Sequence, residues 1–167
     1  MSSRRKENDS VIEVGEPTIT IQLPIYNEKY VATRLVDAVC QQDYPKDKMR
    51  IMVLDDSDDD TVETMSNTVK KYQSLGFDIE HVRRGTRSGY KAGALKHAMK
   101  STDSEFVAIF DADFIPPNWY LKKAMPHFAK SNIGLVQCRW GHINENYSAL
   151  TQAQACLLYT SPSPRDR

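Results

Sequence analysis

Short apolar runs alternate along the chain with segments of helical periodicity, and this alternation constrains the fold more than any other feature. Strands are expected at residues 18–23, 49–54, 77–82, 106–110 and 133–137. Helices are expected at about residues 31–42, 62–75, 91–99 and 118–125. Strands that alternate with helices at this spacing form βαβ units. The predicted fold class is therefore α/β of nucleotide-binding type, with a mostly parallel sheet and helices on both faces.

Two acidic segments directly follow two of the predicted strands. Asp111 and Asp113 stand one residue apart after the strand at 106–110, and residues 55–60 (Asp-Asp-Ser-Asp-Asp-Asp) follow the strand at 49–54. Neighbouring carboxylates at the end of a buried strand can share a hard divalent cation. Ligands of open α/β sheets bind beyond the carboxyl ends of the strands, so both segments are expected to line one crevice. Solvated acidic turns are the alternative interpretation.

A basic segment precedes the third predicted helix. Its cations are Arg83, Arg84, Arg87 and Lys91, and the helix begins with small residues, Ala92-Gly93-Ala94. A helix N-terminus favours anions, and small residues allow a ligand to approach closely. Such a site suits a diphosphate whose remaining charge is met by a metal on Asp111 and Asp113. The alternative is an exposed loop that makes weak surface ion pairs with residues 55–60.

Two further segments carry candidate ligand contacts. The first predicted strand ends in Pro24-Ile25-Tyr26-Asn27-Glu28, which can present a ring and a carboxylate at the strand tip. A turn that begins at Pro24 is the alternative. The last predicted strand runs into Gln137-Cys138-Arg139-Trp140, where an arginine beside a tryptophan can clamp a phosphate or a sugar. A tryptophan that caps the core is the alternative there.

Composition excludes several classes of protein. The chain has 167 residues, which suits one domain, and its formal net charge of 0 gives no basis for nucleic-acid binding. No apolar stretch approaches the roughly 20 residues of a membrane-spanning helix, and no signal peptide is visible. Cys40, Cys138 and Cys156 share no metal-like spacing and are expected to be buried thiols. By itself the chain is expected to be soluble and cytoplasmic.

Five motifs occur in the order seen in family 2 glycosyltransferases. They are Leu23-Pro24-Ile25-Tyr26-Asn27-Glu28, Val53-Leu54-Asp55-Asp56-Ser57, Lys91-Ala92-Gly93-Ala94-Leu95, Asp111-Ala112-Asp113 and Val136-Gln137-Cys138-Arg139-Trp140. Each motif alone is modest, but the five in order are specific. The chain resembles the cellulose-synthase-like and glucomannan-synthase-like membrane branch of the family, from about Thr18 to Ala155.

The resemblance implies a GT-A (Rossmann-like) fold that binds a nucleotide-diphosphate sugar together with Mg²⁺ or Mn²⁺. The residues that it places at the nucleotide are Tyr26 and Glu28 at the base, Asp56 at the base or ribose, Lys91 by the phosphates, and Asp111. It implies that Asp111 and Asp113 form the DxD metal motif, with Asp113 the more direct ligand. Candidate contacts to the donor or the acceptor are Arg87, Gln137, Arg139 and Trp140.

The implied reaction is inverting transfer of a hexose from UDP-glucose or GDP-mannose to a growing polysaccharide. Two family motifs do not occur here: Thr-Glu-Asp, which holds the general base, and the downstream Gln-x-x-Arg-Trp. The membrane helices of this branch are missing as well. We therefore expect a chain truncated near Ala155, which binds the donor weakly and transfers no sugar. The full-length protein is expected in a membrane, with its active site on the cytoplasmic side.

Three regions are expected along the chain. Residues 1–15 form a polar, disordered N-terminus, and residues 16–155 form the donor-binding part of a GT-A domain. Residues 156–167 contain two prolines, and the string from Cys156 onward back-translates naturally into a transposon-type sequencing adapter. We interpret these last residues as a non-native tail, with a flexible Ser/Pro tail as the alternative.

Two other functions stay open on the sequence alone. A nucleotidyltransferase also uses acidic metal ligands and basic loops, but it needs a glycine-rich loop after the first strand, where this chain has Pro24-Ile25-Tyr26-Asn27-Glu28. A non-catalytic module that binds nucleotide and metal is the other alternative. Both enzymes would bind a nucleoside diphosphate in a metal-dependent way. A binding measurement would therefore distinguish them from a module that lacks this affinity.

Overall fold

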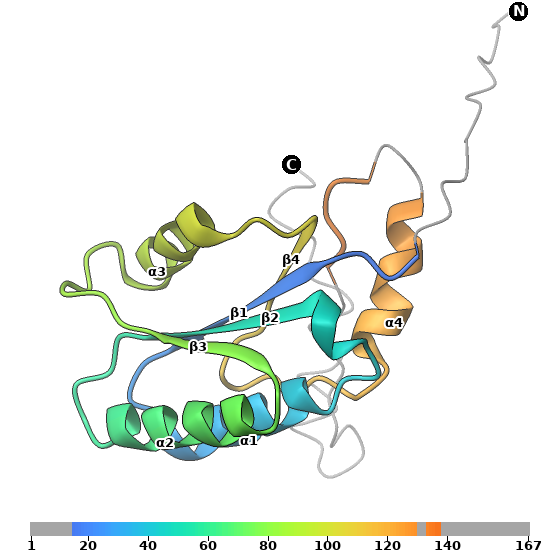
Figure 1. Cartoon of the computed structure of the whole chain (residues 1–167). Coiled ribbons are helices and arrows are strands. Elements are labelled where there is room, and N and C mark those ends of the chain that lie inside the picture. Colours follow the sequence, from blue (N-terminus) through green and yellow to red (C-terminus); the bar gives the residue numbers. More distant parts are fainter. Residues whose placement is uncertain (1–14, 130–132, 138–167) are drawn as a thin grey trace, which may run out of the picture. The chain divides into compact units, whose positions relative to one another are not determined.

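The computed structural model describes residues 15–129 and 133–137 (Figure 1). Its strands are β1 (Ile19–Ile25), β2 (Met49–Asp55), β3 (Asp78–Val82) and β4 (Phe106–Ile109). Its α-helices are α1 (Lys29–Cys40), α2 (Thr61–Ser74), α3 (Tyr90–Ala98) and α4 (Tyr120–Ala124). Short 3₁₀ helices cover Lys46–Lys48, Met99–Ser101 and Met125–Ala129. The predicted α/β class is confirmed.

All four strands of the described sheet are parallel, in the order β3-β2-β1-β4. Ile19 pairs with Met49 on one side and with Phe106 on the other. From β1 the chain thus adds β2 and then β3 on one side of β1. It then crosses back and adds β4 on the other side of β1. This reversal makes the space between β1 and β4 a topological switch point, where ligands of open α/β sheets bind beyond the carboxyl ends of the strands.

Helices cover both faces of the sheet because the central strands are apolar on both sides. Ile51 and Val53 of β2 belong to the core with α1 and α2, while the alternate residues Met52 and Leu54 pack with Ala94 of α3. Figure 1 shows α1 and α2 together on one side of the sheet and α3 on the other. The loop before α3 starts at the carboxyl end of β3, so in this parallel sheet it begins at the same edge as the ends of β1, β2 and β4.

The helix α2 ends at a glycine and begins after a group of aspartates. Gly76 has a φ of +81°, and its N–H donates to the carbonyl oxygen of Gln73 at 3.0 Å. A glycine in this left-handed conformation is a common helix terminator. At the start of α2 the backbone N–H of Thr61 donates to the Oδ1 atom of Asp59 at 2.9 Å. Asp60 is the N-cap residue of α2, but its side chain makes no capping hydrogen bond, so the carboxylate of Asp59 binds the first helical N–H in its place.

Near the end of the described chain one prediction is wrong, and another is confirmed with slightly different bounds. Residues 133–137 form no strand, because a strand needs a hydrogen-bonded neighbour and β4 pairs within the described sheet only with β1. The helix predicted at 118–125 is shorter, α4, and continues as the 3₁₀ helix Met125–Ala129. Pro126 has no N–H to continue an α-helical ladder, which accounts for the change of helix type.

The other predictions about the chain fall in part outside the described residues. Cys40 is a buried free thiol, as expected, and burial, with the nearby Asp37, raises its pKa to about 12. Cys138, Cys156, most of the predicted N-terminal region and the predicted tail at 156–167 lie outside the described residues. Within the described part, no helix has the length and apolar character needed to span a membrane.

Candidate active site

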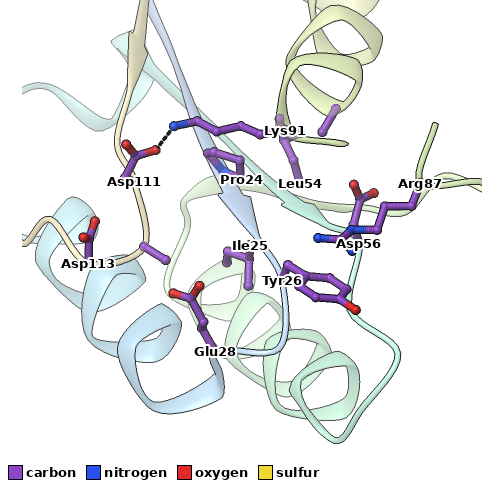
Figure 2. Close-up of a pocket in the computed structure, with 12 residues that line it drawn as sticks. Pro24, Ile25, Tyr26, Glu28, Leu54, Asp56, Arg87, Lys91, Asp111 and Asp113 are labelled. Atoms are coloured by element: carbon purple, nitrogen blue, oxygen red, sulfur yellow. Dashed lines mark hydrogen bonds and ion pairs between the residues drawn. The ribbon is translucent and has the colours of Figure 1, made fainter. Parts of the chain in front are cut away.

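A pocket with a volume of about 340 Å³ opens at the switch point, beyond the carboxyl ends of β1, β2 and β4 (Figure 2). Segments far apart in the sequence supply its lining: the end of β1, the end of β2, the loop before α3 with α3 itself, and the turn after β4. The lining residues are Pro24, Ile25, Tyr26, Glu28, Leu54, Asp56, Arg87, Lys91, Ala94, Asp111, Ala112 and Asp113. Every residue predicted at the nucleotide or the metal is in this set.

The turn after β4 brings both of its aspartates to the pocket, together with Ala112 between them. Ala112 is buried, while Asp113 is exposed, and the N–H of Phe114 closes a turn onto the carbonyl oxygen of Asp111 at 2.9 Å. The Oδ1 atom of Asp111 forms an ion pair with the Nζ atom of Lys91 (Figure 2). The two side chains are 44% and 52% exposed, so a ligand can reach both.

The donor set suits a metal that is shared with a diphosphate. Among the described residues no group of three or more His, Cys, Asp or Glu side chains could hold an ion alone. Mg²⁺ is commonly bound by one or two carboxylates together with substrate phosphates and water. Asp111 and Asp113 are two carboxylates of this kind, and the ammonium group of Lys91 is paired with Asp111 beside them.

The guanidinium of Arg87 stacks on the face of the Tyr26 ring. The Cζ atom of Arg87 lies 3.3 Å from the centroid of the Tyr26 ring and 5.1 Å from that of Tyr90. A guanidinium over an aromatic face is attracted by the ring quadrupole. Within the described part of the chain, Arg87 makes no side-chain hydrogen bond or ion pair. Its donors are therefore open to a ligand in the pocket.

Asp56 lines the pocket but is already paired. Both of its carboxylate oxygens accept hydrogen bonds from the guanidinium of Arg84, from Nε at 2.8 Å and from Nη2 at 2.5 Å. The two side chains are 8% and 12% exposed. Bidentate pairs of this kind are among the stronger polar contacts in proteins.

A buried carboxylate next to Asp56 ties the loops together, and the sequence reasoning missed it. Asp55 is 1% exposed; its Oδ2 lies 2.8 Å from the Nε2 atom of His81, and its Oδ1 accepts the N–H of Ser57 at 2.9 Å. Burial raises the pKa of Asp55, but the hydrogen bonds from His81 and Ser57 outweigh it and hold the pKa below its ordinary value. Asp55 is thus ionised, and His81 donates to it.

The same network reaches the loop after β1. The backbone N–H of Asn27 donates to the Oγ atom of Ser57 at 2.9 Å, and the Asn27 side chain exchanges two hydrogen bonds with Asp58. Asn27 has a φ of +54°, a left-handed conformation that asparagine tolerates better than most residues. These bonds fix Tyr26 and Glu28 relative to the end of β2.

The remaining predicted contacts are not among the described residues that line the pocket. Gln137 is exposed in the described segment 133–137. Arg139 and Trp140 lie outside the described residues. Their predicted contacts with the donor or acceptor stay predictions.

Residues 20–165 match the sequence profile of Glycosyl transferase family 2. The chain belongs to this family. This family 2 glycosyltransferase chain is 40% identical over 155 residues to the Arabidopsis thaliana protein named "Probable glucomannan 4-beta-mannosyltransferase 10". The match covers 88% of this chain and 28% of that protein, so the chain spans less than a third of this relative's length.

Solved structures share the fold of this chain. The mannosyltransferase PcManGT of Pyrobaculum calidifontis, solved with GDP-Man and Mn²⁺, is 32% identical with a TM-score of 0.68, over 74% of this chain and 36% of that one. S. aureus TarS 1-349, solved with UDP-GlcNAc, is 23% identical with a TM-score of 0.59, over 75% of this chain and 38% of that one, and supports the fold alone. The predicted GT-A fold and the family resemblance are confirmed.

Proposed function

We propose that this chain forms the donor-binding part of a glycosyltransferase that uses a nucleotide-diphosphate sugar and Mg²⁺ or Mn²⁺. The observation that carries the proposal is the pocket at the switch point, where Tyr26, Glu28, Lys91, Asp111 and Asp113 converge from three segments. The aromatic ring suits a base, the lysine suits a diphosphate, and the two carboxylates suit a metal ion. Family membership favours this function over a nucleotidyltransferase.

GDP-mannose is the donor we favour over UDP-glucose. The Arabidopsis relative is named as a mannosyltransferase that acts on glucomannan, and PcManGT was solved with GDP-Man. By the same reasoning, the acceptor we propose is a growing β-linked polysaccharide that contains mannose. The full protein is proposed to act at a membrane, as a polysaccharide synthase of this branch.

Different pocket residues bind the base, the metal and the phosphates of the leaving group. Tyr26 would provide a ring face for the base, and the carboxylate of Glu28 would accept a hydrogen bond from it. Asp111 and Asp113 would hold the divalent cation, whose charge would offset that of the departing diphosphate. Lys91, which is paired with Asp111 in this structure, would add its charge to that stabilisation.

The transfer itself inverts the anomeric carbon. The acceptor hydroxyl attacks from the face opposite the diphosphate, the bond to the diphosphate oxygen breaks, and a general base takes the hydroxyl proton. None of the described pocket residues is assigned as this base. We propose that it lies in the region of the relatives that this chain does not span.

Calorimetric titration of the chain with GDP-mannose and UDP-glucose, each with Mn²⁺, tests the donor. We expect GDP-mannose to bind at least about 10-fold more tightly, because a site with fixed polar groups discriminates between bases. Mannose 1-phosphate, which lacks the base, is the control and is expected to bind far more weakly than either donor. Tighter binding of UDP-glucose would reverse the donor assignment, and binding of neither donor would refute the proposed function.

A further inference from the structure

One charged pair in the pocket wall has no part in the mechanism above. Arg84 and Asp56 are both largely buried, and the carboxylate of Asp56 is held by two hydrogen bonds from the same guanidinium. The resemblance to the family implies that Asp56 touches the base or ribose. In this structure both oxygens of Asp56 instead face a protein cation.

Arg84 also holds the loop in front of α3. Its Nη1 atom donates to the carbonyl oxygen of Ser88 at 2.7 Å, and its Nη2 atom donates to that of Tyr90 at 2.7 Å. One guanidinium therefore binds a carboxylate after β2 and two carbonyls that flank Gly89. Only the planar fork of an arginine can satisfy partners in this arrangement.

The loop held by Arg84 has an unusual backbone. Gly89 has a φ of +73° and Tyr90 a φ of +48°, a left-handed conformation that costs energy for a tyrosine. Such a conformation persists where surrounding contacts over-determine it. The hydrogen bond from Arg84 to Tyr90 is one such contact, and the N–H of Tyr90, which donates to the carbonyl oxygen of Arg87 at 3.0 Å, is another.

Close packing against α3 completes the arrangement. A Cβ atom at Gly93 would overlap the carbonyl oxygen of Ser88 and lie 2.5 Å from Nη1 of Arg84. The loop therefore rests directly on the first turns of α3. The two cations of the pocket, Arg87 and Lys91, stand on either side of this held segment and both line the pocket.

We propose that Arg84 and Asp56 form a positioning pair that sets Arg87 and Lys91 for the diphosphate. Asp56 then acts on nucleotide binding through Arg84, in place of the direct contact that the resemblance implies. The inference rests on the proposed function, because it assumes that the pocket binds a nucleoside diphosphate. Arg84 and Asp56 are thereby assigned an effect on the binding of the phosphates and not on the binding of the base.

Arg84→Lys tests the pair, since it keeps the charge but loses the fork. With Mn²⁺ present, we expect the affinity of the chain for GDP to fall on the order of 10- to 100-fold, the usual range for residues that orient a binding group. The affinity for guanosine, which has no phosphate, is expected to stay within about 2-fold. GDP is titrated by calorimetry and guanosine by NMR, and thermal unfolding checks that each variant is folded.

Two further variants sharpen the test. Asp56→Asn is expected to have the same selective effect, and the double variant is expected to be no worse than either single one, because residues that act as a unit are not additive. The matched control is Arg50→Lys. Arg50 also binds a carboxylate, of Glu80 at 3.2 Å, and a carbonyl, of Ser101 at 2.9 Å, but near the amino end of β2. Its replacement should leave GDP affinity unchanged.

Three results would overturn the inference while leaving the proposed function intact. They are wild-type GDP affinity in folded Arg84→Lys, an equal loss of guanosine affinity in Asp56→Asn, and additive losses in the double variant. An equal loss for guanosine would show that Asp56 touches the base. Absence of GDP binding by the wild-type chain with Mn²⁺ is a different result, and would refute the proposed function together with this inference.

Discussion

Replacing Asp113 with alanine is expected to lower the affinity of the chain for GDP in the presence of Mn²⁺ on the order of 100-fold, or about 2.7 kcal/mol. Asp113 is exposed at the pocket, and only Asp111 lies beside it as a second acidic ligand after β4. Changes to residues that merely orient a metal ligand cost about 10- to 100-fold, so loss of a ligand belongs at or beyond the upper end. Calorimetric titration measures the effect.

The control for this variant is Asp103→Ala. The side chain of Asp103 is 91% exposed and lies before β4, at the opposite edge of the sheet from the pocket. The Asp103→Ala substitution removes the same charge without touching the proposed metal site. We therefore expect its GDP affinity to be within about 2-fold of wild type. Equal affinities in Asp113→Ala and wild type would contradict the assignment of Asp113 as a metal ligand.

Gly93→Ala is expected to disrupt the loop before α3, although alanine is the better helix former. Alanine favours a helix interior over glycine by roughly 1 kcal/mol, whereas overpacking typically costs about 1–3 kcal/mol. The overlap here is with a backbone carbonyl, that of Ser88, which no side-chain rotation can relieve. The loop must move, and Arg87 and Lys91 move with it. We expect at least about a 10-fold loss of GDP affinity with Mn²⁺.

A glycine in the same loop serves as the control. A Cβ atom at Gly85 would meet no atom within 4 Å, so Gly85→Ala should retain wild-type GDP affinity and unfolding temperature. Both quantities are measured for both variants, by calorimetry and by thermal unfolding. If Gly93→Ala bound GDP like Gly85→Ala, the close packing of the loop on α3 would have no role in the site.

The sheet and the location of the site could be predicted because they depend on local patterns. The apolar runs at residues 18–23 and 49–54 read as buried parallel strands, and β1 and β2 cover them to within one or two residues. Once the strands are parallel, residues that follow them must meet at one edge. The convergence of Tyr26, Lys91 and Asp111 in one pocket follows from that rule.

Pairing between charged side chains could not be predicted in the same way. Asp55 and Asp56 are adjacent in sequence, yet one is buried against His81 and the other is held by Arg84. One signal was present: Asp55 directly continues the apolar run Ile51-Met52-Val53-Leu54, and every residue of β2 from Ile51 to Asp55 is buried. The partner of Asp56 had no such signal, because three arginines of one loop were equal candidates.

The false strand at 133–137 shows a different limit. An apolar run reports burial or pairing only if a partner strand is available, and this partner depends on the whole topology. The described sheet ends at β4, and Leu135 is 68% exposed. Residue type alone therefore carried less information here than in β1 and β2, which have neighbours on both sides.

The proposed function requires that the pocket beyond β1 and β4 binds a nucleoside diphosphate together with a divalent cation. The decisive experiment is calorimetric titration of GDP into the wild-type chain, once with Mn²⁺ and once with EDTA. We expect binding with Mn²⁺ and an affinity at least about 10-fold weaker with EDTA, since two carboxylates without a cation repel the diphosphate. Equal affinity under both conditions, or no binding with Mn²⁺ to the folded chain, would contradict it.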